Sequence, residues 1–233
     1  MIGASSGIGR ELSKILSREN YCVGLAARST HLLESLSKEL NTDSHIKMLD
    51  VSKPDDAMSG LRQLIFEMDG VDLIVFCSGT GFVNPDLDWE NEKATIDVNV
   101  TGFYCIANTA LKYFIEKGSG HFAAISSVAA LRGSGDSPSY SASKAFMSNY
   151  LEGLLCMAKK MKKDIKVTDI MPGFVDTKMA QGEGLFWVAS PMKAAEQIYG
   201  IINGTRYSGY VTKRWRIIAW LLKVLPKWIY CRL

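Results

Sequence analysis

The chain opens on the glycine-rich stretch Gly3-Ala4-Ser5-Ser6-Gly7-Ile8-Gly9, which runs directly into residues 10–18, a segment with the spacing of an amphipathic helix. Glycines at this spacing permit a tight turn, close approach of the backbone to a diphosphate, and close packing of a helix. The amino end of the helix adds unpaired N–H groups and a positive dipole that favour an anion. An ordinary glycine-rich turn can have the same sequence. The interpretation as a diphosphate-binding loop therefore depends on the elements that follow it in the chain.

Short apolar runs alternate with helical patterns from residue 21 to residue 212. We expect strands at 21–27, 46–49, 71–76, 121–125, 165–170 and 209–212. We expect helices at 31–40, 54–68, 89–117, 139–161 and 191–202. This alternation predicts one doubly wound α/β domain over residues 1–212, a Rossmann fold with a parallel sheet and three α/β/α layers. Ligands of such folds bind beyond the carboxyl ends of the strands.

Tyr140 and Lys144 are four residues apart in one predicted helix, so their side chains lie on the same face. A phenol has a reference pKa of about 10. A nearby ammonium favours the phenolate and makes the tyrosine a usable general acid/base. Ser127 follows the apolar run 122–125, at a strand end, and is placed as a second donor to the same substrate oxygen. The alternatives are an exposed Tyr/Lys pair and a serine that caps a loop.

The bulk composition suits one large domain with a sizeable core, because 47% of the 233 residues are hydrophobic. Five cysteines form no Cys-x-x-Cys pair, which predicts a reduced, cytoplasmic setting without disulfides or a zinc cage. The three histidines, His31, His45 and His121, show no metal-ligand spacing, so we expect no metal site.

The net charge of +3 hides an asymmetry between the body and the C-terminal segment. Residues 206–233 contain seven Lys or Arg and no Asp or Glu, whereas the rest of the chain carries 20 basic and 24 acidic residues. We interpret residues 213–233 as a basic amphipathic helix in which Arg216, Lys223 and Lys227 share one face. Pro226 is expected to end or kink this helix.

The longest uncharged run of this segment, residues 217–222, is far shorter than the roughly 20 apolar residues of a membrane span. A basic apolar helix with three tryptophans suits a membrane surface that carries anionic lipid, which would make the protein peripheral on the inner face of a membrane. The alternative is packing on its own domain or on a second subunit. Nucleic acid is not expected as a partner, because no recognition module accompanies the charge.

The motifs, taken in order, resemble those of the short-chain dehydrogenase/reductase family, in its short single-domain branch. The similarity covers roughly residues 3–212. It rests on Gly3-x-x-x-Gly7-x-Gly9, Asp50-Val51, Asn99 in Asn-Val-Thr-Gly, Ser127, Tyr140-x-x-x-Lys144, and Pro172-Gly173 with Thr177.

The resemblance implies a role for each matching residue. Tyr140 would exchange the proton with the substrate oxygen, and Lys144 would lower the pKa of that phenol and hydrogen-bond the nicotinamide ribose. Ser127 would orient and polarise the carbonyl, and Asn99 would kink its helix and hold a water that joins Lys144 to solvent. The cofactor would be contacted by Gly3, Ser5, Gly7, Ile8 and Gly9 at the diphosphate, Asp50 and Val51 at the adenine, Gly79 through its backbone, and Val175 and Thr177, after Pro172 and Gly173, at the nicotinamide carboxamide.

Three of these residues have a structural alternative. Asn99 also suits a polar position inside a helix, and Asp50 also suits a cap at a strand end. Thr177 also suits a helix N-cap, where threonine is favoured.

The choice of cofactor depends on Arg28, just after the strand predicted at 21–27. In this fold an acidic residue there accepts a hydrogen bond from the adenosine ribose of NAD, whereas an arginine suits the 2′-phosphate of NADP. No Asp or Glu occupies residues 26–30. We therefore favour NADP(H) over NAD(H), with a solvated surface arginine as the alternative.

The sequence departs from the family at two places in the body. The family's first strand, at the centre of the sheet, is missing apart from Met1-Ile2. We therefore expect a truncated first strand, two buried strands that lack a hydrogen-bonding partner, and a natural chain with further residues upstream. After the strand predicted at 71–76, the family's Asn-Ala-Gly is replaced by Cys77-Ser78-Gly79, which keeps the glycine and which we interpret as tolerable variation.

The resemblance implies a NAD(P)H-dependent oxidoreductase that reduces a ketone or aldehyde, or oxidises the alcohol, with Tyr140 as general acid/base. Pocket walls are predicted at 128–137 and 177–190. We expect the second wall to act as a lid, with hinges at Gly182 and Gly184. Its apolar residues indicate a hydrophobic substrate; they are Met179, Leu185, Phe186, Trp187 and Val188.

Family members suggest a homodimer or homotetramer through the helices at 92–117 and 139–161. Two other classes of function stay open: a non-catalytic cofactor-binding protein and a membrane-associated scaffold on the same fold. A sugar-nucleotide epimerase or dehydratase of the longer branch needs a larger C-terminal domain than the about 60 residues that follow Pro172.

Overall fold

The computed structural model describes residues 1–177, 179 and 186–232. Its strands are β1 (Val23–Ala27), β2 (Ser44–Met48), β3 (Leu73–Phe76), β4 (Ser119–Ile125), β5 (Asp164–Pro172) and β6 (Ser208–Val211). Its helices are α1 (Gly7–Arg18), α2 (Thr30–Ser37), α3 (Pro54–Glu67), α4 (Trp89–Ile96), the π-helix η1 (Asp97–Gly102), α5 (Phe103–Lys117), the 3₁₀-helix η2 (Val128–Leu131), α6 (Pro138–Lys160), α7 (Pro191–Ile202), α8 (Trp215–Val224) and α9 (Lys227–Tyr230).

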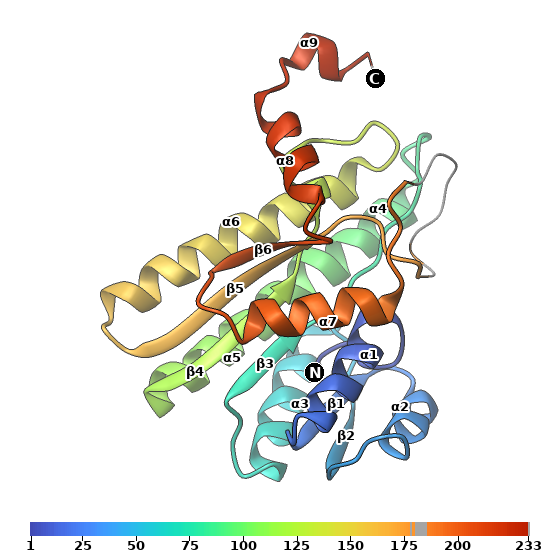
Figure 1. Cartoon of the computed structure of the whole chain (residues 1–233). Helices are drawn as coiled ribbons and strands as arrows, with labels where there is room; N and C mark the ends of the chain where they lie inside the picture. Colours follow the sequence, from blue (N-terminus) through green and yellow to red (C-terminus); the bar gives the residue numbers. More distant parts are fainter. Residues whose placement is uncertain (178, 180–185, 233) are drawn as a thin grey trace.

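All strand pairs are parallel, and helices connect them. β1 pairs with β2, and the other strands form a sheet in the order β3-β4-β5-β6. Helices cover both faces, with α1 and α7 side by side on one of them (Figure 1). This arrangement confirms the predicted doubly wound α/β fold, in which helical crossovers bury a parallel sheet on both sides.

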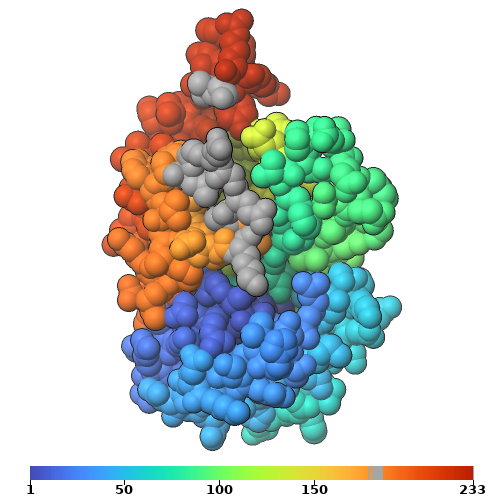
Figure 2. All heavy atoms as spheres, turned by 90° about the vertical axis from the view of Figure 1, so that its right-hand side faces the viewer, coloured from blue at the N-terminus to red at the C-terminus, as the bar shows by residue number. Residues whose placement is uncertain are grey.

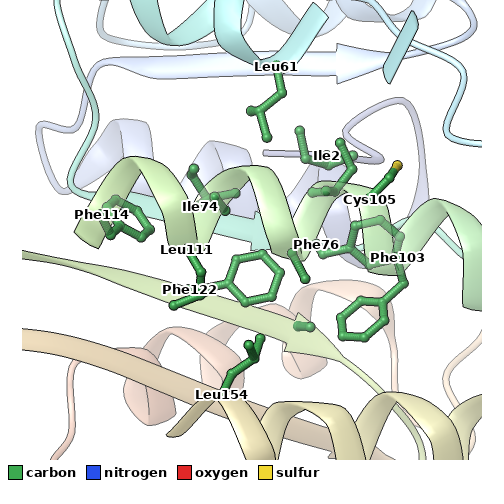
Figure 3. Close-up of a cluster of buried hydrophobic side chains, with 14 of the residues drawn as sticks. Ile2, Leu61, Ile74, Phe76, Phe103, Cys105, Leu111, Phe114, Phe122 and Leu154 are labelled. Carbon is green, nitrogen blue, oxygen red and sulfur yellow. The ribbon is translucent and has the colours of Figure 1, made fainter. Parts of the chain in front are cut away.

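Two cores lie on opposite faces because successive strand residues point to opposite sides. On the face of α3, α5 and α6, the core contains Leu61, Ile74, Phe76, Phe103, Phe114 and Phe122 (Figure 3). On the face of α1, α2 and α7, it contains Leu12, Leu25, Leu33, Val75, Ala123 and Ile198. The alternation of Ile74, Val75 and Phe76 between the two cores shows that β3 is buried from both sides.

The first residues form a short central strand between β1 and β3. Ile2 bridges both Ala26 and Phe76 in parallel. Its N–H donates to the carbonyl oxygen of Val75 at 2.9 Å, and its carbonyl oxygen accepts from the N–H of Cys77 at 2.8 Å. Ile2 thus joins the two groups of paired strands through its backbone. A groove of about 560 Å³ lies next to Met1. It is lined by the first residues of β1 and by β3.

The α-amino group of Met1 lies at the edge of this groove. It donates a hydrogen bond of 2.7 Å to the carbonyl oxygen of Gly24. Burial lowers the pKa of this amine to about 6, against a smaller opposing effect of the Cys77 thiol. A group that prefers to be charged in water is thus held in the interior beside the groove.

Two predicted helices are interrupted in the structure. The helix expected at 89–117 is divided into α4 and α5 by the π-helix η1. The helix expected at 213–233 is divided into α8 and α9, because Pro226 lacks an N–H group and its ring clashes with the preceding turn. Arg216 and Lys223 therefore share α8, whereas Lys227 belongs to α9. Within the described residues, none of the helices combines the length and apolar character needed to cross a bilayer.

The half-buried imidazole of His121 in β4 makes stability depend on pH. Its Nε2 lies 2.8 Å from the hydroxyl of Thr168, and burial, together with the charge of Lys166, lowers its pKa from 6.5 to about 3. In the unfolded chain His121 becomes protonated below about pH 6.5, whereas in the folded chain its imidazole stays neutral down to about pH 3. We therefore predict that unfolding free energy falls, by up to ~1.4 kcal/mol per pH unit, as pH drops from 6.5 towards 3. Denaturant titrations of wild type and His121→Gln should show a flatter profile for the variant; parallel profiles would contradict this.

Candidate active site

Lys144 is held at the carboxyl end of β4. Its side chain is only 4% exposed, and its Nζ donates a hydrogen bond of 2.9 Å to the carbonyl oxygen of Ile125, the last residue of that strand. The same nitrogen lies 5.8 Å from the centroid of the Tyr140 ring, one turn earlier in α6. The spacing of four residues therefore brings the ammonium and the phenol ring together, as predicted from the helix period.

Ser127 joins this pair from the loop that follows β4. Its hydroxyl accepts from the N–H of Ala129 at 3.1 Å, donates towards the carbonyl oxygen of Pro172 at 3.4 Å, and hydrogen-bonds the phenol of Tyr140. The serine thus caps η2 and contacts Tyr140 at the same time, so the structural and the functional interpretation of this residue are compatible. The structure therefore brings together the side chains of Ser127, Tyr140 and Lys144.

Burial sets the protonation of both titratable groups. It raises the pKa of Tyr140, and the hydrogen bond between Tyr140 and Ser127 only partly opposes this. It lowers the pKa of Lys144 to about 8, against the opposing charges of Asp169 and Cys77. A neighbouring ammonium was expected to lower the pKa of Tyr140, whereas the structure raises it. The physical reason is that the phenol loses its water shell, while the ammonium is bonded to the Ile125 carbonyl.

Asn99 lies in the π-helix η1 and is fully buried. Its side-chain oxygen accepts from the N–H of Thr80 at 2.9 Å, and its amide nitrogen donates to the carbonyl oxygen of Thr80 at 2.7 Å and to the hydroxyl of Ser143 at 3.0 Å. Single π-turns inside helices are frequent at functional sites. Asn99 thereby ties the loop after β3 to α6, next to Lys144.

The loop after β3 packs closely on this cluster. A Cβ added at Gly79 would lie 3.4 Å from both Asn99 Oδ1 and Lys144 Nζ, and one added at Gly81 would lie 2.5 Å from the ring of Tyr140. Gly81 and Thr80 were not identified as site residues from the sequence. The signal was present in the stretch Cys77-Ser-Gly-Thr-Gly81, since glycine permits the close approach of a loop to a side chain.

The glycine loop before α1 is packed so closely on neighbouring backbone that side chains would not fit at two of its positions. Gly3 has φ +91°, and a Cβ there would meet the backbone N of Ser78 at 2.6 Å; one at Gly9 would collide with the carbonyl oxygen of Gly3. Ser5 and Ser6 complete the turn, and Ile8 stands in the first turn of α1. The N-cap Ser6 makes no side-chain hydrogen bond to the helix end. Backbone N–H groups at an uncapped helix start fit a diphosphate.

The predicted adenine side lies at the ends of β1 and β2. Asp50 accepts from the N–H and the hydroxyl of Ser52, at 3.0 and 2.8 Å. Burial would raise the pKa of Asp50, but these bonds and the charge of Arg28 outweigh it and the pKa lies below its ordinary value. Arg28 is exposed, close enough for its charge to act on Asp50, and Val51 is buried. Asp50 thus acts as a turn cap here.

The predicted nicotinamide side is formed by the end of β5 and the segment after it. A Cβ at Gly7 would meet Thr177 Cγ2 at 3.2 Å, so Thr177 lies against the glycine loop. Val175 is buried and bridges Ala189. Gly173, next to Pro172, is covered by the indole of Trp215 from α8. Of the predicted lid, Gly182, Gly184 and Leu185 lie outside the described residues.

A comparison with known protein families gives a match over most of this chain. The family described as short chain dehydrogenase matches residues 1–185. The chain belongs to the short-chain dehydrogenase family. Members of this family of oxidoreductases use NAD or NADP as cofactor.

Two relatives with more than 30% identity agree with the short-chain dehydrogenase assignment. An uncharacterized oxidoreductase of Myxococcus xanthus is 36% identical over 76% of this chain and 71% of its own length. One of Staphylococcus haemolyticus is 34% identical over 77% of this chain and 78% of its own.

Two solved structures share the fold of this chain. An alcohol dehydrogenase from Thermococcus sibiricus, complexed with 5-hydroxy-NADP, has a TM-score of 0.80 at 22% identity, covering 91% of this chain and 94% of its own. A short-chain dehydrogenase from Streptomyces avermitilis has a TM-score of 0.82 at 21% identity, covering 96% and 89%.

Proposed function

We propose that this protein reduces a ketone or aldehyde with NAD(P)H, or oxidises the corresponding alcohol, with Tyr140 as general acid/base. The observation that carries the proposal is the meeting of Ser127, Tyr140 and Lys144 at the end of β4, with Gly79 and Asn99 packed against Lys144. A non-catalytic cofactor-binding protein would have no need to bring a serine, a tyrosine and a buried lysine together at one strand end.

The cofactor has a fitting place in this chain. We infer that the backbone at Gly3, Gly7 and Gly9 and the start of α1 hold the diphosphate, because the N-cap Ser6 makes no side-chain hydrogen bond to the helix end and a glycine turn precedes it. Val51 and Asp50 would border the adenine, and Thr177 and Val175 the nicotinamide. When bound, the cofactor supplies the hydride to the substrate carbon.

The residues of the chain position the substrate oxygen and move the proton. The raised pKa keeps the phenol of Tyr140 protonated at neutral pH, which is the form that donates to the oxygen of a carbonyl being reduced. Ser127 offers a second hydrogen bond to that oxygen. Lys144, whose pKa is lowered to about 8, is suited to restore the proton of Tyr140 after each turnover.

The residues beside the site favour an apolar substrate. Phe186, Trp187 and Val188 are 46%, 38% and 41% exposed, and Met179 is 39% exposed, although all are large and hydrophobic. Exposed apolar side chains grouped near a site mark a surface that binds another apolar group. We therefore propose a hydrophobic ketone or aldehyde.

A substrate screen tests this function. Purified protein is mixed with NADPH and a panel of apolar and small polar carbonyl compounds, and NADPH absorbance and alcohol formation are followed together. We expect turnover with at least one apolar carbonyl. Binding of NADPH with no carbonyl consumed across the panel would support a cofactor-binding protein instead, and turnover of small polar carbonyls alone would remove the apolar substrate.

Arg28 supports a preference for NADP(H), because it is an exposed cation that directly follows β1. We predict that Arg28→Ala weakens NADPH binding by at least about tenfold, the effect of losing a hydrogen bond to a charged group. NADH binding should change little. Fluorescence titrations with both cofactors measure this, with Arg18→Ala, an exposed arginine of α1, as the matched control. Equal or better turnover of wild type with NADH would contradict the preference.

We also propose that copies of the chain associate through α5 and α6. Tyr104 and Phe146 are 47% and 38% exposed, and the Phe146 ring stacks on that of Tyr150 at 5.8 Å between centroids. Aromatic side chains are enriched at protein interfaces. Sedimentation velocity should therefore show an oligomer that is weakened by Phe146→Ser; a monomeric wild type would contradict this.

A further inference from the structure

The helix α8 has two apolar faces and buries only one of them. Trp215 and Ala219 are 4% and 1% exposed and face the body. The opposite side carries an apolar stripe with the helical spacing i, i+3, i+4, i+7, which we call the outer stripe. It consists of Ile217 (65% exposed), Trp220 (65%), Leu221 (44%) and Val224 (53%). A globular protein normally turns such a stripe towards a partner.

The outer stripe continues towards the end of the chain. Trp228 of α9 is 66% exposed. Figure 1 shows α8 and α9 outside the layered body, with α9 farther out, and Figure 2 shows the same segment as a projection from one end of the molecule. The exposed aromatic residues therefore stand at the end of a projection, where a flat surface can reach them.

Only basic charges accompany the outer stripe. Arg216 and Lys223 are exposed on α8, Lys213 precedes it, and Lys227 follows it, whereas residues 206–233 contain no Asp or Glu. Lys213, Arg216, Ile217 and Trp220 also line a shallow groove of about 410 Å³. A groove with two cations beside an apolar helix face suits a phosphate group attached to a hydrophobic chain.

The projection is fastened to the body. The guanidinium of Arg132 donates to the carbonyl oxygens of Leu222, at 2.8 Å, and of Leu225, and the phenol of Tyr230 donates to the carbonyl oxygen of Gly133 at 2.7 Å. At its root, Trp215 stacks on Phe186 with 5.2 Å between ring centroids. The orientation of α8 relative to the domain is thus fixed by contacts with the two segments predicted to wall the substrate pocket.

We propose that α8 and α9 dock this protein on the surface of an anionic membrane, with the outer stripe and Trp228 at the boundary of headgroups and acyl chains. The helices are too short to span a bilayer. Their charge is complementary to anionic lipid. A second copy is a poorer occupant, because a two-fold contact would place Arg216 and Lys223 against the same cations with no carboxylate in the segment.

This docking also connects the predicted pocket walls to the membrane-bound segment through the contacts of Arg132, Gly133 and Phe186. Arg132 and Gly133 belong to the wall at 128–137, and Phe186 belongs to the wall at 177–190. Resting on the proposed function, we infer that the apolar carbonyl is a lipid-soluble compound that enters from the membrane. Membrane binding itself is measured without any turnover, so its failure and the failure of the reductase proposal are distinguishable.

Vesicle co-sedimentation of the full chain tests the docking surface. We expect binding to vesicles of phosphatidylcholine mixed with phosphatidylglycerol that is at least about tenfold stronger than to phosphatidylcholine alone. The double variants Trp220→Ser with Trp228→Ser, and Arg216→Glu with Lys223→Glu, should each lose about tenfold or more of this binding. All four residues are exposed, so these variants are expected to fold, and circular dichroism checks it.

Matched controls lie on the far helices. Phe66, 85% exposed on α3, gives Phe66→Ser, and the exposed Lys38 and Arg62 give Lys38→Glu with Arg62→Glu; both controls should bind anionic vesicles as wild type does. The proposal is overturned if wild type binds neither vesicle, if it binds both equally, or if the controls lose as much binding as the α8 variants. It is also overturned if Trp220→Ser with Trp228→Ser converts an oligomer to a monomer in sedimentation velocity and vesicle binding is absent.

Discussion

Replacing Tyr140 by phenylalanine is expected to lower kcat for carbonyl reduction by roughly 10²–10⁴-fold, the range for loss of a positioned general acid. The phenyl ring keeps the packing against Gly81 and the contact with Lys144, and only the oxygen that hydrogen-bonds Ser127 is removed. The affinity for NADPH and the melting temperature should therefore change little. Steady-state kinetics with the best carbonyl of the screen measure the loss.

Tyr150→Phe is the matched control for this variant. Tyr150 lies on the same helix and packs among Phe103, Tyr104 and Phe146. Loss of its hydroxyl should leave kcat within about twofold of wild type, because no described residue of the site contacts that oxygen. If Tyr140→Phe retains the rate of Tyr150→Phe, the proton comes from another group and the assignment of Tyr140 is wrong.

Adding a strand at the amino terminus is expected to give the largest gain in stability. The groove of about 560 Å³ next to Met1 lies between parts of β1 and β3 that both offer backbone groups to a strand between them. A strand of about five Val and Ile residues would fill it, because a central parallel strand is apolar on both faces. The extension would also turn the buried amine of Met1 into an amide.

The expected net gain is a few kcal/mol. Apolar burial of about 1.5–3 kcal/mol per residue and hydrogen bonds of about 1 kcal/mol each exceed an ordering cost of about 1–2 kcal/mol per residue for the backbone. For a domain of this size each kcal/mol raises the melting temperature by ~2–4 °C, so we expect an increase of about 10 °C by calorimetry. A Gly/Ser extension of equal length is the control. Equal melting temperatures for the two extensions would show that the groove does not accept a strand.

The order of strands and helices followed from local patterns in the sequence, because most elements kept the hydrophobic period expected of them. The apolar runs at 71–76 and 121–125 became β3 and β4, and the Tyr/Lys spacing placed both side chains on one face of α6. The π-helix at Asn99 could not be located, since it depends on the bonds of that side chain to Thr80 and Ser143 across the fold. The resemblance to the family implied a kink there, but not its form.

Other features of the site depend on burial, which no local pattern encodes. The sign of the pKa change at Tyr140 was expected from the charge of Lys144, whereas desolvation of the phenol dominates in the structure. The tryptophans of the C-terminal segment look alike in sequence, yet Trp215 covers Gly173 and Trp220 faces solvent. Only the packed structure separates the indole that supports the site from the one left free for a partner.

The most direct test of the central claim is the fate of the hydrogen at C4 of the nicotinamide. The protein is supplied with NADPH carrying deuterium on the transferred side of C4 and with an apolar ketone, and the product alcohol is analysed by mass spectrometry and NMR. The Ser127, Tyr140 and Lys144 site predicts one deuterium on the carbinol carbon for wild type and almost no product for Tyr140→Phe. Alcohol without carbon-bound deuterium, or unchanged labelled product from Tyr140→Phe, would contradict it.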